Sequence, residues 1–253
     1  MTDPATPQIS SAYPALKRAF DIAFSAALLL ALSPILLAVS LLVKLTSAGP
    51  VFFRQVRIGK DGSEFTLFKF RSMYVDAPAY ALTPTDDEDP RITQVGRFLR
   101  PSSVDELPQM INVLLGDMSI VGPRPEMPFL VAQYTPEQRR RLVVKPGLTG
   151  LWQISPARYE LIHENLQYDF YYIEHASFAL DVKVVLQTIA LVLRDSLAAA
   201  QRLYRRLSRQ APKVVRAAEP ALAPLSSGYG TRSTRTAGRA GRSAAAAVQL
   251  HDE

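Results

Sequence analysis

Residues Ile22 to Val43 form a run of 22 residues without a charged side chain, and leucine dominates it. As a straight helix this run would be ~33 Å long, which is enough to cross a bilayer core of ~30 Å. The dominance of leucine disfavours a core helix of a water-soluble protein. The sequence therefore predicts a protein that enters a membrane.

A proline at the centre of the run decides how the chain enters the membrane. Ser33-Pro34 lies midway along it. Proline there removes a helical hydrogen bond and clashes with the preceding turn, so a kink is expected. Each half is then about 11 residues, or ~16 Å, close to the thickness of one leaflet. We predict a re-entrant helix–break–helix over residues 17–48, with the break at Ser33 and Pro34.

Basic residues flank the apolar run on both sides, with Lys17 and Arg18 before it and Lys44 and Arg54 after it. Because cytoplasmic loops collect lysine and arginine, this symmetry is satisfied most simply when both ends are cytoplasmic. An ordinary spanning helix remains the alternative, since proline also occurs in helices that cross a bilayer. A signal peptide is disfavoured, because the run is long and no small-residue cleavage site follows it closely.

Composition excludes several classes of site. The chain has no cysteine, so disulfides, zinc–thiolate sites and thiol catalysis are excluded. The three histidines, His163, His175 and His251, are too scattered for a metal triad. Residues 201–253 contain ten Lys or Arg and three Asp or Glu, so the formal net charge of +6 belongs to this tail. A nucleic-acid-binding core is therefore not indicated.

Two β-prone stretches, Val51–Phe53 and Phe65–Phe70, follow the membrane segment. Gly59-Lys60-Asp61-Gly62 lies between them, so they predict a β-hairpin with an Asp-Gly turn. Its basic side chains include Lys69 and Arg71. These either meet phosphates or anionic lipid head groups, or are simply solvated strand residues.

The segment Gly96–Pro125 holds an acidic pair, Asp105-Glu106. Ser103 and Glu106 have the spacing of a capping box, followed by an apolar run, so we expect a helix to begin here. A carboxylate in a first helical turn lies near unpaired backbone N–H groups and the positive end of the helix dipole, which favours its ionised form. A nucleophile or a metal ligand needs that form, and the same groups attract phosphate. The alternative is that the acids only stabilise the helix.

The stretch Lys145–Gln153 is rich in turn residues and contains the only tryptophan. Gly147 permits the close approach of a ligand to the backbone. Trp152 could stack on a base, lie at a membrane interface or be a packing residue. Four consecutive acids, Asp86–Asp89, resemble metal ligands, but they cannot all face one ion, and a solvated loop is favoured.

The last part of the chain predicts helices from Pro136 towards Lys145, over His163–Tyr172 and over Ala179–Leu207. The third is amphipathic, with arginines in its later part, which is typical of a helix lying on a lipid surface. Residues 210–253 are rich in Ala, Arg, Ser, Gly and Pro, and are expected to be disordered.

A series of motifs is spread from about Lys17 to Leu193. They are Lys17-Arg18 with Asp21, Ser33-Pro34, Gly49-Pro50-Val51, Gln55-x-Arg57-x-Gly59, Lys69–Met73, Asp89–Thr93, Arg100 through Gln109, Asn112–Ser119, Val121–Pro125, Lys145–Gly150, and Asp169 with Tyr171-Tyr172. In these motifs the chain resembles the monotopic phosphoglycosyl transferases, a family of bacterial sugar transferases.

The resemblance implies a mainly helical α+β fold: a monotopic membrane protein with the re-entrant helix, a β-hairpin and interfacial amphipathic helices. We expect a flexible N-terminus over residues 1–16, the membrane helix over 17–48, a catalytic domain over 49–209 and a disordered basic tail over 210–253. It also implies the bacterial inner membrane, with the catalytic domain on the cytoplasmic face.

The activity that the resemblance implies is transfer of a sugar-1-phosphate from a nucleotide-sugar, usually a UDP-sugar, to polyprenyl phosphate. This is the first membrane step in building an exopolysaccharide or glycoconjugate. The implied cofactor is Mg²⁺, and the implied partners are the two substrates and the membrane, with no nucleic acid. A homodimer is an assembly that the sequence leaves open.

The resemblance also implies the residues of the site. Asp105 is the expected nucleophile, and Asp105 and Glu106 are the expected metal ligands. The expected substrate- and phosphate-binding residues are Lys69, Arg71, Arg100, Pro123, Arg124, Gly147, Trp152 and Asp169. Ser155-Pro156-Ala157-Arg158 departs from the Ser-Gly-Arg-Asn-like turn of many relatives, which puts an inferred donor specificity in doubt. A phosphohydrolase and a non-catalytic membrane adaptor are the competing functions.

Overall fold

The computed structural model describes residues 12–78, 84 and 89–210. The predicted flexible N-terminus as far as residue 11, three of the four acids at 86–89 and the basic tail lie outside the described residues. The elements are α1 (Tyr13–Thr46), β1 (Phe52–Ile58), β2 (Glu64–Phe70), α2 (Gly96–Leu99), α3 (Gln109–Leu115), β3 (Ser119–Val121), α4 (Pro128–Val131), α5 (Pro136–Arg139), β4 (Gly147–Thr149), α6 (Leu151–Ile154), α7 (Gln167–His175) and α8 (Phe178–Gln210). The fold is therefore mainly helical with two small sheets, as predicted.

Helix α1 is the one described helix long and apolar enough to cross a membrane, with a mean hydropathy of 2.6 over its most apolar window. It begins at Tyr13, inside the segment expected to be flexible. Much of its surface is bare, and Leu30, Leu37 and Leu45 are each more than 70% exposed. A large exposed apolar surface of this kind marks contact with a membrane or another apolar partner.

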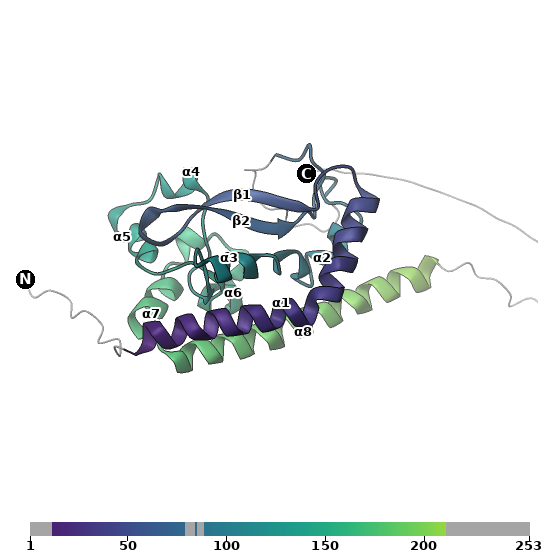
Figure 1. Cartoon of the computed structure of the whole chain (residues 1–253). Helices are drawn as coiled ribbons and strands as arrows, with labels where there is room; N and C mark the ends of the chain where they lie inside the picture. Colours follow the sequence, from purple (N-terminus) through teal and green to yellow (C-terminus); the bar gives the residue numbers. More distant parts are fainter. Residues whose placement is uncertain (1–11, 79–83, 85–88, 211–253) are drawn as a thin grey trace, which may run out of the picture. The chain divides into compact units, whose positions relative to one another are not determined.

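Helix α1 continues through Pro34 and is bent (Figure 1). Its first part lies alongside α8, and its later part rises to the start of β1. Proline has no N–H for the carbonyl of Leu30, four residues earlier. The hydroxyl of Ser33 donates to that carbonyl at 2.8 Å instead. The Ser-Pro pair thus bends the helix and also satisfies the acceptor that the bend exposes.

Strands β1 and β2 form the predicted antiparallel hairpin, with Phe52 opposite Phe70 and Ile58 opposite Glu64. Its turn places Asp61 at φ 54° and Gly62 at φ 81°, left-handed conformations that Asp and Gly tolerate. The later part of α1 packs against this hairpin through a cluster that includes Val43 and Phe70. The later part of α1 and the hairpin are therefore packed against each other.

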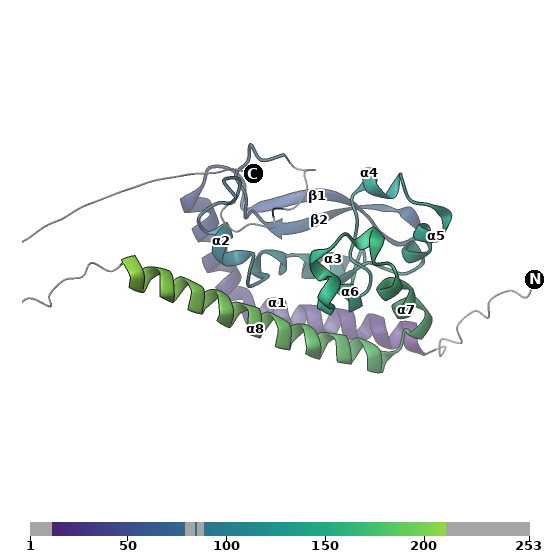
Figure 2. The same cartoon turned by 180° about the vertical axis from the view of Figure 1, so that it is seen from behind.

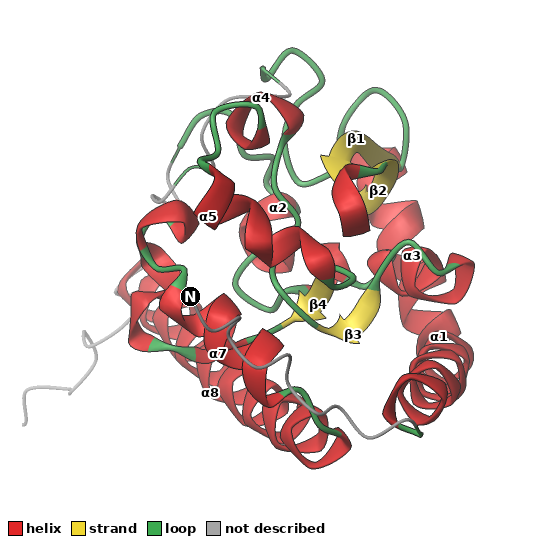
Figure 3. Ribbon diagram, turned by 90° about the vertical axis from the view of Figure 1, so that its left-hand side faces the viewer, coloured by secondary structure: helices red, strands yellow, loops and turns green. Residues whose placement is uncertain are grey.

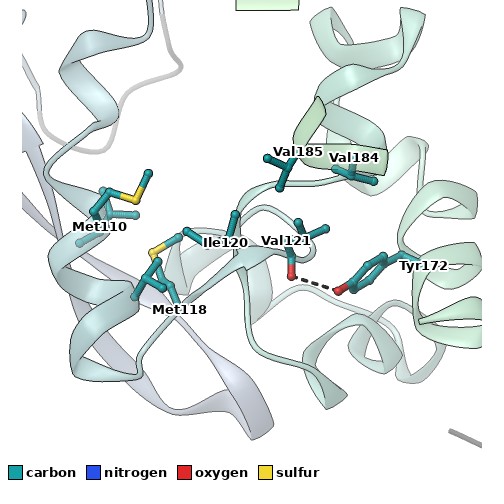
Figure 4. Close-up of a cluster of buried hydrophobic side chains, with 9 residues drawn as sticks. Met110, Met118, Ile120, Val121, Tyr172, Val184 and Val185 are labelled. Atoms are coloured by element: carbon teal, nitrogen blue, oxygen red, sulfur yellow. Dashed lines mark hydrogen bonds between the residues drawn. The ribbon is translucent and has the colours of Figure 1, made fainter. Parts of the chain in front are cut away.

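The main core lies between the hairpin, α3, β3 and the beginning of α8. It consists of Leu67, Met110, Val113, Met118, Ile120, Val121, Tyr172, Val184 and Val185 (Figure 4). Both side views show α3 between the hairpin and the pair of long helices α1 and α8 (Figures 1 and 2). The short parallel strands β3 and β4 lie between α1 and α3 on one side and α7 and α8 on the other (Figure 3).

Helix α8 confirms the predicted long helix and extends it slightly at both ends. In its first part Val184 is fully buried, whereas Leu193 and Leu197 in its later part are each at least 60% exposed. These two leucines therefore face away from the described core.

Candidate active site

The acidic pair lies in a 3-10 turn, Val104–Glu106, and not in an α-helix. Ser103 has φ 55°, a left-handed conformation, and its side chain makes no cap. An N-cap residue needs extended backbone, so the predicted capping box is wrong. Helix α3 begins only after Pro108, a residue that suits a helix start because it lacks an N–H. Side-chain neighbours, and not a helix dipole, therefore set the charge of the pair.

Glu106 is held by two cations from distant parts of the chain. Its Oε1 accepts from Nζ of Lys69, on β2, at 2.6 Å and from Nη2 of Arg124, after β3, at 2.9 Å. Burial alone would raise the pKa of Glu106, but Arg124 and Lys69 outweigh it and hold that pKa well below its usual range. Glu106 is thus a carboxylate at any physiological pH.

The surroundings of Asp105 shift its pKa in the opposite direction, upwards. Asp105 is only 7% exposed, and the one side-chain hydrogen bond described for it is from Oγ of Ser72 to Oδ2 at 3.5 Å. Burial, and then the charge of Glu106, raise the pKa of Asp105, and Lys69 is the strongest of the opposing cations. The expectation that its surroundings favour the ionised form is therefore corrected, because the helix terminus on which it depended is absent.

The structure brings three of the predicted phosphate-binding residues to the acidic pair: Lys69, Arg124 and Arg100. Nη2 of Arg100 donates to the carbonyl of Pro84 at 2.9 Å. Arg100 is close enough to Asp105 to lower its pKa. A negatively charged ligand at Asp105 would thus meet cations from β2, from the end of α2 and from the loop after β3.

Arg71 is not part of this group. Strand β2 ends at Phe70, so the alternation of the strand does not carry Arg71 to the face of Lys69. Its guanidinium is buried and donates to carbonyls at the end of α1, those of Ser47 at 2.8 Å and of Ala48. These contacts identify Arg71 as a cap for α1 and give no support to its predicted place among the phosphate ligands.

Trp152 and Asp169 are both buried. Trp152 packs with Ala157 and Ile162, which is the packing alternative of the sequence analysis. Asp169 is 2% exposed, and its Oδ2 accepts from Nε of Arg141 at 2.8 Å. Their predicted contacts with substrate stay predictions.

Pro123 and Gly147 shape the loop that carries Arg124. The N–H of Gly147 donates to the carbonyl of Pro123 at 2.8 Å. A Cβ at position 147 would lie 2.1 Å from the backbone nitrogen of Gly122, so only glycine allows this approach. Gly147 is therefore required by backbone packing between β4 and the loop.

Two residues of the site were missed by the sequence analysis. Ser72 stood within the quoted motif Lys69–Met73, but nothing distinguished it from its neighbours. Arg141 stood within the helix predicted from Pro136 towards Lys145, and nothing distinguished it from the arginines before it. Their roles depend on contacts with Asp105 and Asp169, which no local pattern reveals.

The donor set suits Mg²⁺ held together with a substrate. In the described part of the chain, no group of three or more His, Asp or Glu side chains could form a metal site. Mg²⁺ is usually bound by one or two carboxylates, with phosphates and water completing its shell. Asp105, with only a weak hydrogen bond, fits as such a ligand. Both oxygens of Glu106 already face Lys69 or Arg124, so Glu106 would have to release one of them.

Residues 12–195 match the model of the bacterial sugar transferase family. The chain belongs to this family. It is 45% identical over 187 residues to the UDP-glucose:undecaprenyl-phosphate glucose-1-phosphate transferase of Escherichia coli, covering 69% of this chain and 39% of that protein. It is 41% identical to the exopolysaccharide production protein PSS of Rhizobium leguminosarum, covering 69% of this chain and 93% of that protein.

A third relative of this bacterial sugar transferase is the UDP-N-acetylgalactosamine-undecaprenyl-phosphate N-acetylgalactosaminephosphotransferase of Aeromonas hydrophila, at 40% identity over 73% of this chain and 45% of that protein. The chain thus spans less than half the length of these Escherichia coli and Aeromonas hydrophila relatives. These two relatives are named for different sugars, glucose and N-acetylgalactosamine, so family membership does not define the donor sugar.

Proposed function

We propose that this chain transfers a sugar-1-phosphate from a UDP-sugar to undecaprenyl or another polyprenyl phosphate, and so initiates synthesis of an exopolysaccharide or glycoconjugate. The names of its relatives support the substrate classes. The observation that carries the proposal is the pairing of a buried, nearly unbonded Asp105 with a Glu106 that Lys69 and Arg124 hold in place.

The reaction is a double displacement with Asp105 as nucleophile. A carboxylate oxygen of Asp105 attacks the sugar-linked phosphorus, and the bond to the bridging oxygen breaks. The nucleoside monophosphate leaves with that electron pair, and the sugar phosphate remains as an acyl phosphate on Asp105. An oxygen of polyprenyl phosphate then attacks the same phosphorus and restores the carboxylate. Covalent catalysis divides one encounter between a soluble and a lipid substrate into two steps.

The neighbouring residues stabilise charge in these steps. Arg100, Arg124 and Lys69 place cations around phosphoryl oxygens, whose charge must be neutralised during transfer. Glu106 keeps Lys69 and Arg124 together on one side of Asp105. Mg²⁺, when bound to Asp105 and the donor phosphates, supplies further charge neutralisation.

The membrane arrangement belongs to the same proposal. The bend at Pro34, the bare leucines of α1 and the exposed apolar residues of α8 support a re-entrant anchor with an interfacial helix beside it. Such an anchor places Asp105 at the cytoplasmic surface of the inner membrane, where a soluble donor and a lipid acceptor can both reach it.

The decisive experiment uses the purified chain and a donor labelled in the sugar, taken from a screen of UDP-sugars that begins with UDP-glucose. Without acceptor, we expect one equivalent of nucleoside monophosphate and a labelled protein adduct. Asp105→Asn should give neither, whereas Asp61→Asn, at an exposed turn, should behave as wild type. Nucleotide release that requires both substrates, with no adduct, would refute the mechanism. Label appearing as free sugar phosphate would indicate a phosphohydrolase.

A further inference from the structure

In the loop of residues 123–126, which carries Arg124, every backbone carbonyl accepts a hydrogen bond. Four consecutive carbonyls accept hydrogen bonds from outside the loop: Pro123 from Gly147 N at 2.8 Å, Arg124 from Arg141 Nη2 at 2.9 Å, Pro125 from Arg57 Nη1 at 3.1 Å and Glu126 from Ile58 N at 3.0 Å. A loop held at every residue has very few conformations to lose when its side chain meets a ligand. The loop is therefore suited to holding one side chain in one place.

Arg141 makes the hydrogen bond to Arg124, the residue of this loop whose side chain bonds Glu106. Its guanidinium is buried and uses three different nitrogens, Nε to Asp169 at 2.8 Å, Nη1 to the hydroxyl of Tyr134 at 2.8 Å and Nη2 to the carbonyl of Arg124 at 2.9 Å. The planar fork of arginine fixes the relative directions of these bonds. The carbonyl of Arg124 is thereby tied to α7 and to Tyr134.

Stabilisation of the fold does not by itself explain why Arg141 and Asp169 are paired in the protein interior. The side chains of Arg141 and Asp169 are 1% and 3% exposed, and burying two charges costs about as much free energy as their attraction returns. The pair also orients the guanidinium of Arg141, because Nη2 lies 2.8 Å from Oδ2 of Asp169 and donates to the carbonyl of Arg124 at 2.9 Å. The side chain of Arg124 in turn bonds Glu106, the neighbour of Asp105.

We infer that Arg141, held by Asp169, is a positioning residue for the transfer reaction: it fixes the backbone of Arg124 so that the guanidinium of Arg124 meets Glu106 and the substrate phosphates. This inference rests on the proposed function. It gives Asp169 a role that acts through two arginines, in place of the direct substrate contact that the sequence suggested.

The test is a double-mutant cycle on the purified full chain, with the UDP-sugar that wild type turns over fastest and undecaprenyl phosphate. Arg141→Lys keeps the charge beside Asp169 but cannot reach all three acceptors. We expect a fall in kcat on the order of ten- to a hundredfold, the range for a misplaced catalytic group, with a smaller change in KM for the donor. In an Arg124→Lys background the same change should alter kcat by no more than about twofold, because the side chain it positions is already altered.

Arg140→Lys is the matched control. Arg140 is exposed, adjoins Arg141 in the chain and also pairs with an acid of α7, Glu174, at 3.5 Å. It should leave kcat near wild type in both backgrounds. If Arg141→Lys lowers kcat by the same factor with and without Arg124→Lys, Arg141 serves only the fold and the inference is wrong.

A milder variant covers the case in which Arg141→Lys does not fold. Tyr134→Phe removes only the hydroxyl that Nη1 of Arg141 uses, and its cycle with Arg124→Lys should show the same non-additivity on a smaller scale. Additive losses in that cycle would equally overturn the inference. A wild-type chain that turns over none of the UDP-sugars would instead count against the proposed function itself.

Discussion

The Nζ of Lys69 lies 2.6 Å from Oε1 of Glu106, and this ion pair adds to that of Arg124 in making two adjacent carboxyl groups differ in pKa. Lys69 and Arg124 are directed at Glu106, so Glu106 stays ionised. Burial, and then the charge of Glu106, raise the pKa of Asp105 by more than Lys69 and the two arginines lower it. One carboxylate thus organises cations, and the other is left available for chemistry.

The raised pKa of Asp105 predicts an acid limb in the pH profile of nucleoside monophosphate release. Only ionised Asp105 can attack, and a raised pKa keeps it protonated to a higher pH than an ordinary aspartate. The rate should therefore fall, as pH is lowered, sooner than for a normal carboxylate. Lys69→Met removes a cation that lowers this pKa, so its acid limb should move to higher pH. Lys60→Met, in the exposed hairpin turn, should not move the limb, and an unmoved limb in Lys69→Met would contradict the assignment.

Ser72→Ala should slow the first step without abolishing it. The bond from Oγ to Asp105 is 3.5 Å long, at the weak end for hydrogen bonds. A loss of ~0.5–1 kcal/mol, or about two- to fivefold in rate, is expected from its removal. The labelled adduct should still form. Ser102→Ala, which loses only bonds to backbone carbonyls of α2, is the control. Complete loss of the adduct in Ser72→Ala would show that the hydroxyl does more than orient Asp105.

Arg71→Met should destabilise the fold and leave donor binding intact. Its buried guanidinium donates to carbonyls at the end of α1, and charged hydrogen bonds are worth about 1.5–3 kcal/mol each. We expect a lower Tm for the detergent-solubilised variant, with a wild-type KM for the donor in the folded fraction. An unchanged Tm together with a raised KM would return Arg71 to the phosphate site.

Removal of divalent metal should stop nucleoside monophosphate release. Asp105 and the donor phosphates together offer the hard oxygen ligands that Mg²⁺ requires. EDTA should abolish the release, and added Mg²⁺ should restore it. Release that persists after thorough chelation would exclude a metal role in the first step.

The bend in α1 predicts that both chain ends are cytoplasmic. Because the chain has no cysteine, single probes can be introduced as Thr2→Cys and His251→Cys without background labelling. Both should resist a membrane-impermeant thiol reagent in intact cells. Pro34→Leu supplies the missing N–H to Leu30 and should allow a straight, spanning helix, which would expose Cys at position 2. Labelling of Thr2→Cys in the otherwise unchanged chain would favour a spanning helix.

Much of the architecture followed from short-range patterns. The apolar run and its proline predicted α1 and its bend, the β-prone stretches on either side of Asp61-Gly62 predicted the hairpin, and the amphipathic pattern after Ala179 predicted α8. Each of these features is decided by residues within a few positions of one another, and that is the range over which residue type alone fixes backbone conformation. The family motifs likewise drew attention to Asp105 and Glu106.

The tertiary structure determines which groups each charged side chain contacts. Lys69 and Arg71 are equivalent in the sequence, yet one bonds Glu106 across 37 positions and the other caps α1. The S-x-x-E spacing suggested a capping box, but the chain enters Val104 through a left-handed Ser103. Asp169 was predicted to bind substrate, and in the fold its carboxylate accepts a hydrogen bond from Arg141. The sequence alone determined which charged groups are present. Their ionisation and their contacts depend on burial and on segments far apart in the chain, which only the packed fold brings together.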